Sequence, residues 1–225
     1  MHTMRPPRVE ELYSDGPHLA TYAFEIGNPD LKEERIYGIE NSINFNSDHF
    51  EFSIISFYNY SPYYFEMTKD GNCIIPDDWQ PWTSHPCYGV DWIDWGSGGL
   101  GWLHKYSAKG NEVTIKGAEV DMKYNFKSLD LNYNLSFVQG DNMTTKIPLP
   151  YINPTKQILS LSYNESYFNY TLRWTRFHAQ DRLGEFESYT PGAELTDLII
   201  SYWGEKHNFT IQINNIFDKV HYNHL

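Results

Sequence analysis

Leu129-Asp130-Leu131-Asn132-Tyr133-Asn134-Leu135-Ser136-Phe137 is the stretch that decides the fold class of this chain. Each odd-numbered residue in it is aliphatic or aromatic, and each even-numbered residue is polar. Because successive side chains of a β-strand point to opposite faces, this alternation predicts a strand with one apolar and one polar face.

The same two-residue period recurs on both sides of this stretch, whereas helical periodicity is scarce. Further strands are predicted at residues 37–45, 50–60, 113–124, 159–163, 168–174, 198–202 and 209–213. Within residues 113–124 the apolar positions change from odd to even numbers at Gly117, which predicts a β-bulge there.

The connections between these strands come in two alternating sizes. Short turns are predicted at residues 46–48, 126–128, 164–166 and 204–206, and long connections at 61–99, 139–155 and 178–194. The pattern predicts an all-β, antiparallel up-and-down meander of about eight strands, with short turns at one end and long loops at the other. This sorting is typical of transmembrane β-barrels of the outer membrane. The alternation alone would also fit a half-exposed sheet in a soluble protein.

The composition argues against a nucleic-acid-binding protein and against a protein with membrane-spanning helices. The 225 residues carry 17 basic and 29 acidic side chains, a net charge of −12, which argues against a nucleic-acid partner. No apolar run approaches the roughly 18 residues that a membrane-spanning helix needs, which excludes helical spans but not a β-barrel, whose strands are shorter and alternate.

Four segments, in order along the chain, resemble the TonB-dependent outer-membrane receptors. Arg5-Pro6-Pro7-Arg8-Val9-Glu10-Glu11-Leu12 is similar to an R-x-P-x-x-E-E-L stretch of that family, and Gly27-Asn28-Pro29-Asp30-Leu31 to its G-N-P-x-L. Gln180-Asp181-Arg182-Leu183-Gly184-Glu185 precedes a predicted strand, and Asn214-Asn215-Ile216-Phe217-Asp218-Lys219 is similar to the N-L-F-D-K signature near the receptor C-terminus. Gly16-Pro17-His18 and the segment from Gln180 to Glu187 resemble most closely the subgroup that includes zinc-uptake receptors.

The resemblance implies a fold and a place in the cell. Receptors of this family have barrels of about 22 strands around a plugged lumen. Residues 1–225 would therefore be the C-terminal portion of such a barrel, without the plug domain, the earlier strands and the final strand. No apolar secretory segment follows Met1, so a chain outside the cytoplasm would also lack its true N-terminus.

The resemblance also implies a function. The full receptor would take up a scarce nutrient, such as a metal, a metal chelate or a siderophore, across the Gram-negative outer membrane. Energy would come from the TonB-ExbB-ExbD complex through the missing plug, and outer-membrane lipid would surround the barrel. Neither catalysis nor a cofactor is expected.

In such receptors the extracellular loops meet the cargo, so ligand contacts are expected in the long connections. The first of them contains Trp79, Trp82, Trp92 and Trp95 together with His85 and Asp94, which could stack on a sugar or an aromatic chelate or bind a cation. Alternatively, these aromatics pack on one another as a small separate core. Cys73 and Cys87 lie in the same connection and would pair in an oxidising compartment, or remain free in the cytosol.

Residues with metal-ligand side chains occur in two other connections. His18 and Glu25 precede the first long strand, and Asp181 and Glu185 lie in the last long connection. No close histidine pair makes a metal site specific, so the metal remains unknown and solvated loop side chains are the alternative.

A different function class fits part of the pattern. A secreted, soluble β-sandwich could use the tryptophan-rich connection to bind glycans. A hydrolase would need paired catalytic carboxylates or a nucleophile with its base, and no such arrangement stands out.

Overall fold

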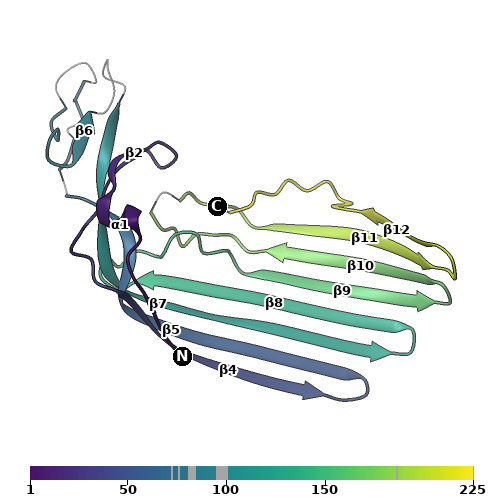
Figure 1. The fold of residues 1–225 in the computed structure, drawn as a ribbon. Coiled ribbons are helices and arrows are strands. Elements are labelled where there is room, and N and C mark those ends of the chain that lie inside the picture. Colours follow the sequence, from purple (N-terminus) through teal and green to yellow (C-terminus); the bar gives the residue numbers. More distant parts are fainter. Residues whose placement is uncertain (72, 76, 81–84, 95–100, 186, 225) are drawn as a thin grey trace.

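The structure is a computed structural model that describes residues 1–71, 73–75, 77–80, 85–94, 101–185 and 187–224 (Figure 1). In these residues twelve strands form one sheet, accompanied by one short helix. The elements are β1 (His2–Arg5), α1 (Val9–Tyr13), β2 (Asp15–His18), β3 (Ala23–Ile26), β4 (Glu34–Asn46), β5 (Phe50–Lys69), β6 (Trp92–Asp94), β7 (Trp102–Phe126), β8 (Leu129–Asn142), β9 (Lys156–Glu165), β10 (Phe168–Phe177), β11 (Ala193–Trp203) and β12 (Asn208–Ile213). No helix among the described residues is long and apolar enough to cross a bilayer.

Eight long strands form the predicted meander. Each pairs antiparallel with the next in the order β4-β5-β7-β8-β9-β10-β11-β12. Figure 1 shows the short turns at one end of the strands, here named the turn end, and the long connections at the opposite end, here named the loop end. The all-β, up-and-down prediction is therefore confirmed.

The four remaining strands are short and were not predicted. β1 pairs with β4, β2 and β3 form a hairpin, β3 lies parallel to β7, and β6 pairs with β7. Each has only three or four residues, too few to show a period. Most of them lie against the part of β5 and β7 that continues beyond the other strands as an upright arm (Figure 1). We define the arm as this part together with the connection between β5 and β7, which comprises residues 64–71, 73–75, 77–80, 85–94 and 101–111.

The two faces of the meander are the reverse of those of a water-soluble sheet. Leu131, Leu161 and Leu172 stand side by side in register, yet 40%, 46% and 48% of their surfaces are exposed. On the opposite face Ser162, Asp197 and Ser201 are only 8%, 8% and 7% exposed. We name these the apolar face and the polar face. Their exposure means that none of the described residues covers this part of the apolar face.

The predicted bulge at Gly117 is wrong. Pairing runs without a shift from Val113 to Tyr124 against both β5 and β8. A Cβ at Gly117 would lie 2.6 Å from the ring of Phe57, so the glycine makes room for a cross-strand aromatic. The apolar residues of β7 change from odd to even positions because the surroundings of its two faces change along its length. Val113 and Ile115 lie on the polar face at a height where the connection containing Leu149 and Ile152 covers it.

The bulge occurs instead on β5. Ser61 pairs with Val113 but Tyr64 pairs with Asn111, so β5 has one more residue than its partner between these two pairs. Pro62, which has no N–H to donate, lies inside it. β4 shows a register shift at the same place.

The long connections are shorter than predicted. β5 continues to Lys69, so the first connection does not begin at Ser61, and β8 continues to Asn142 rather than ending before Gln139. At the bulge, the residues of β5 that share a face change from odd to even numbers. The second half of the strand therefore does not continue the alternation of the first half and resembles irregular sequence.

Candidate functional site

A cavity of about 320 Å³ lies at the loop end and collects residues from four distant segments. The β2–β3 hairpin contributes His18 and Glu25, and β5 contributes Tyr64 and Glu66. The connection between β8 and β9 supplies residues 149–152, and the connection between β10 and β11 supplies Glu185. Three of the predicted ligand residues, His18, Glu25 and Glu185, thus line one cavity.

The side chains of His18 and Glu25 form a hydrogen bond within the hairpin. The imidazole Nδ1 lies 2.6 Å from Glu25 Oε1, and the two side chains are 53% and 24% exposed. The bond fixes the carboxylate, while solvent still reaches the imidazole.

Glu66 is brought to this cavity by the bulge on β5. The extra residue reverses which side chains face each way, so Glu66 lies on the same face as Asn111 of β7. Its Oε2 accepts hydrogen bonds from the Nδ2 of Asn111 at 3.1 Å and from the Nδ2 of Asn142. Burial raises the pKa of Glu66, and Glu185 raises it further, whereas the two amides lower it.

A hydrogen bond from a residue of the arm holds the carboxylate of Glu185 in place. The hydroxyl of Tyr106 donates to Glu185 Oε1 at 3.0 Å, and Tyr106 itself is buried. Burial raises the pKa of the Tyr106 hydroxyl, and the negative charge of Glu185 adds to the effect, so this residue donates throughout the physiological range.

The remaining lining of the cavity is apolar. Phe65, Met67 and Ile115 from the strands and Leu149 and Ile152 from the connection surround the three carboxylates. Such a lining with a few convergent polar groups is typical of small-molecule sites. Within the described residues no group of three or more histidine, cysteine, aspartate or glutamate side chains is arranged to hold a metal ion.

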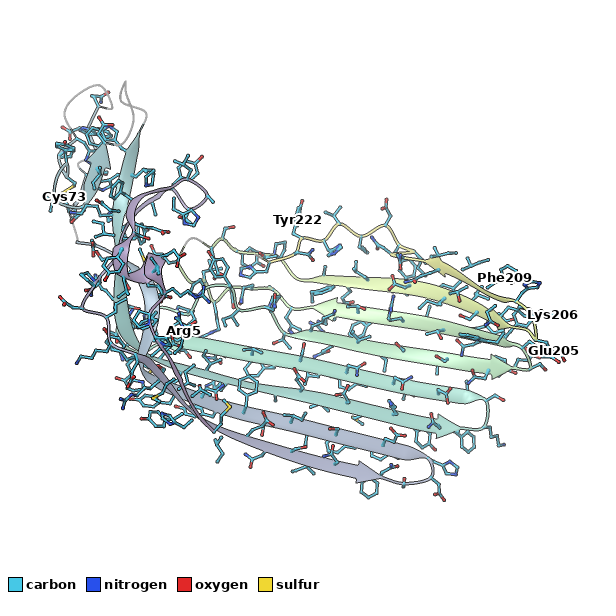
Figure 2. The ribbon with its side chains drawn as sticks, viewed as in Figure 1. Arg5, Cys73, Glu205, Lys206, Phe209 and Tyr222 are labelled. Atoms are coloured by element: carbon cyan, nitrogen blue, oxygen red, sulfur yellow. A yellow bond between two sulfur atoms is a disulfide. The ribbon has the colours of Figure 1, made fainter. Side chains whose placement is uncertain are left out.

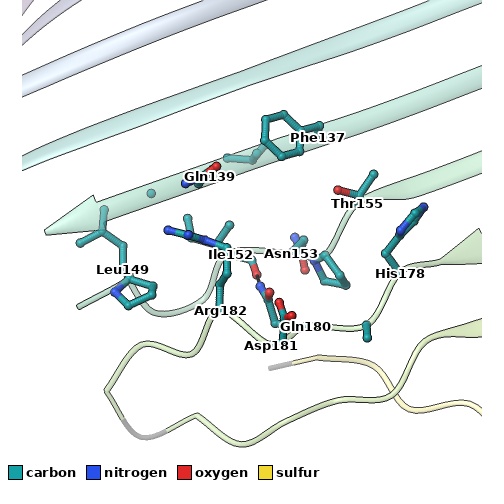
Figure 3. A pocket seen from close by; sticks show the side chains of 15 residues that line it. Phe137, Gln139, Leu149, Ile152, Asn153, Thr155, His178, Gln180, Asp181 and Arg182 are labelled. Atoms are coloured by element: carbon teal, nitrogen blue, oxygen red, sulfur yellow. Dashed lines mark hydrogen bonds between the residues drawn. The ribbon is translucent and has the colours of Figure 1, made fainter. Parts of the chain in front are cut away.

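Asp181, the fourth predicted residue of metal-ligand type, does not join this cavity. It lines a separate cavity of about 390 Å³ together with Gln139, His178 and Arg182. Figure 3 shows this cavity with Leu149 at one end and Thr155 and His178 at the other. Arg182 forms an ion pair with Asp141 on the wall of β8.

The tryptophan-rich connection packs on itself. The ring centroid of His85 lies 4.8 Å from that of Trp79 and 4.9 Å from that of Trp92, and His85 is only 4% exposed. Trp102 lies against the same imidazole at 4.7 Å. These contacts fit the small aromatic core that was the alternative to a ligand site. Trp82 and Trp95 lie outside the described residues, and Asp94 is exposed on β6.

A disulfide joins Cys73 and Cys87 beside this core, with 5.7 Å between their Cα atoms. Figure 2 places Cys73 in the upright arm, far from Glu205 and Lys206 at the turn end. The buried Asp91 accepts a hydrogen bond from the backbone N–H of Cys73 at 2.5 Å. Burial, and then the nearby His104, lower the pKa of His85, so its imidazole stays neutral within the core.

Sequence reasoning missed Glu66, Asn111, Asn142 and Tyr106. All four belong to strand extensions that were assigned to loops or left unassigned. The alternation of Tyr64, Glu66 and Thr68 with Phe65 and Met67 was the signal for the extension of β5.

The sequence of the chain matches the family described as "TonB dependent receptor-like, beta-barrel" over residues 2–216. The chain belongs to this receptor family. Family members are transporters and receptors, so this chain is not an enzyme, in agreement with the prediction.

Solved structures of receptors share the fold. The copper transporter OprC superposes with a TM-score of 0.73 at 17% identity, covering 99% of this chain and 31% of that one. The siderophore receptor PirA from Acinetobacter baumannii gives 0.65 at 14% identity, covering 97% and 34%. The ferric enterobactin receptor PfeA from Pseudomonas aeruginosa, as the mutant R480A, gives 0.65 at 16% identity, covering 97% and 32%.

This chain therefore spans about a third of the length of the receptors that it matches. At these identities the likeness establishes the fold alone. The predicted relation to zinc-uptake receptors within the family stays a prediction.

Proposed function

We propose that this chain is the C-terminal portion of the barrel of an outer-membrane receptor that takes up a scarce nutrient, such as a metal, a metal chelate or a siderophore. The eight-strand meander forms about a third of the barrel wall. Its apolar face contacts lipid, and its polar face lines the lumen.

The observation that carries this proposal is the reversal of the two faces. An aliphatic row through Leu131, Leu161, Leu172 and Leu198 crosses four strands in register. Exposure of such a row to water would be unfavourable, whereas contact with hydrocarbon stabilises it. On the polar face hydrogen bonds link neighbouring strands, as between Ser162 and Thr171 at 2.7 Å and between Arg173 and Asp197 at 3.0 Å. Water in a lumen would solvate this face.

The side chains on the apolar face of β7 support a boundary for the lipid-facing band. On its apolar face Val120 and Met122 are followed, toward the loop end, by Lys116, Thr114 and Glu112. The change falls within a few residues of Gly117. We place the outer edge of the hydrocarbon there, so the arm and the cavity of Glu66 stand outside the membrane.

The cavity at the loop end supports a cationic cargo or a cargo with a cationic part. Glu25, Glu66 and Glu185 give it a negative potential, and the chain as a whole carries a net charge of −12. We propose that His18, Glu25 and Glu185 contact this cargo as it enters the lumen. In the whole receptor, TonB with ExbB and ExbD would supply the energy through a plug domain.

The test is the need for an amphiphile. The full chain is refolded in dodecyl maltoside and transferred either into phosphatidylcholine vesicles or into buffer. We expect strand-type circular dichroism and co-flotation with the vesicles, and aggregation in buffer. A chain that stays monomeric and folded in buffer would contradict the proposal.

The same experiment separates this proposal from the soluble glycan-binding module. A β-sandwich needs a second sheet packed on the first, but all strands among the described residues belong to one sheet. A folded, monomeric chain in buffer would favour the glycan-binding alternative.

A further inference from the structure

A second cavity at the loop end differs in charge from the one around Glu66. It measures about 300 Å³ and lies between the polar face and the C-terminal segment. Its lining contains Lys156, His178 and His224 and, among the described residues, includes no aspartate or glutamate. In a chain with a net charge of −12, a cavity lined only by basic and neutral residues is distinctive.

The strands build one wall of this cavity. Ser136, Lys156 and Phe177 are cross-strand neighbours in β8, β9 and β10 and therefore share the polar face. The Lys156 ammonium lies 5.2 Å from the centre of the Phe177 ring. Among the described residues Lys156 forms no ion pair, although Glu119 and Asp121 border a neighbouring cavity with it.

The C-terminal segment builds the opposite wall and is fixed there. The ring of His221 stacks on Phe177 with 5.9 Å between centroids. His224 Nε2 lies 3.1 Å from Glu187 Oε1, and its Nδ1 lies 2.9 Å from the hydroxyl of Thr190. Both nitrogens of His224 are therefore occupied, and this residue shapes the wall rather than binding a ligand.

His178 offers a nitrogen that the protein does not use. Its backbone N–H donates to Thr155 at 2.9 Å, which fixes the residue at the end of β10. Its Nε2 is buried and has no hydrogen-bond partner among the residues that the structure describes. A buried polar atom without a partner is costly, and a ligand that accepts a hydrogen bond from it would remove that cost.

We propose that this cavity binds the oxyanion group of a small soluble molecule, a carboxylate or a phosphate, between the Lys156 ammonium and the His178 imidazole. Charge-assisted hydrogen bonds from both groups satisfy such an anion. The cavity volume lies at the lower end of the range of small-molecule sites, which suits a compact anion. This inference goes beyond the proposed function, and binding here requires no transport.

The test uses the full chain in dodecyl maltoside, whose headgroup is uncharged. Isothermal titration calorimetry with citrate and, separately, with inorganic phosphate measures the affinity of the wild type and of Lys156→Met and His178→Phe. We expect saturable binding of at least one of the two anions, and an affinity about tenfold weaker or more in each variant.

Matched controls lie at the turn end. Lys206→Met and His207→Phe make the same changes of residue in the β11–β12 turn and should leave the affinity unchanged. Circular dichroism of each variant verifies that the strands remain. Absence of saturation in the wild type would overturn the inference, and so would an affinity in either cavity variant equal to that of its control. Failure of this test leaves the vesicle experiment above unaffected.

Discussion

Glu66 is a carboxylate held partly out of water by the fold. Its raised pKa comes first from burial and then from Glu185, and the amides of Asn111 and Asn142 offset only part of the effect. A raised pKa means that folding favours the protonated carboxyl. The contribution of Glu66 to stability is therefore complete below the ordinary pKa of 4.5 and is lost as the pH rises through the raised value.

The variant Glu66→Gln should remove this dependence, because the amide oxygen still accepts both hydrogen bonds but never ionises. Urea unfolding of the refolded chain at pH 4 and pH 7 measures the effect. We expect stability to fall less between these two pH values in the variant than in the wild type. Glu205→Gln, in an exposed turn, is the control and should follow the wild type. Equal pH dependence in Glu66→Gln and the wild type would show that Glu66 is solvated like a surface residue.

Sequence reasoning at this scale found residues of the β2–β3 hairpin and of the last long connection, and missed those of the extensions of the long strands. His18, Glu25 and Glu185 were chosen for their residue type and their position in connections, and they line one cavity. Glu66 was missed because a bulge changes which residues share a face, and the bulge was expected at Gly117. A glycine opposite an aromatic and a glycine in a bulge look the same in sequence.

The arm is an element whose stability is local. Its aromatic core of Trp79, His85, Trp92 and Trp102 is small, and the disulfide closes a loop around it. Crosslinking a loop of this length stabilises the folded arm by about 3 kcal/mol in the chain-entropy model. Both cysteines lie outside the eight long strands.

The double variant Cys73→Ser/Cys87→Ser should therefore open the arm and leave the sheet intact. We expect chymotrypsin to cleave after Tyr88 or Trp92 about a hundredfold faster or more, since cleavage follows the population of the open arm. Mass spectrometry of the fragments identifies the sites. The urea midpoint of the strand signal should not change, and a large fall in that midpoint would show that the arm and the sheet unfold as one unit.

The strands themselves could be predicted because the two different faces of such a sheet require apolar and polar residues to alternate along each strand. Leu129 to Phe137 needs only the two-residue period. Pairing partners, the parallel contact of β3 with β7 and the folding of the connections depend on residues far apart in the chain, and no local pattern carries that information.

At the scale of the whole molecule, the apolar face is exposed and the two lateral edges of the sheet are open. β12 pairs only with β11, and β4 beyond Gly38 pairs only with β5 among the described residues. Unpaired edges invite further strands. Both features fit a wall segment of a larger barrel, in which neighbouring strands pair with the edges and lipid covers the face.

A charge on the apolar face should be costly only in a bilayer. Leu131→Arg should lower the stability of the chain folded in phosphatidylcholine vesicles by about 2–4 kcal/mol. Asn134→Arg, on the polar face of the same strand and beside Asp121, should be tolerated. Urea unfolding from vesicles, followed by tryptophan fluorescence, gives both values. Equal costs for the two variants would mean that the two faces meet the same surroundings.

The two-residue alternation also affects how such a chain is made. A membrane-spanning helix is retained by the inner membrane because about 20 apolar residues follow one another. Here polar residues interrupt the apolar ones, as between Leu129 and Phe137, and the mean hydropathy of the chain is −0.57. In the proposed outer-membrane receptor, the export machinery would therefore meet a largely polar, unfolded polypeptide and let it pass. The apolar surface comes into existence only when the strands pair, so secretion through one membrane and insertion into the next are compatible within a single sequence.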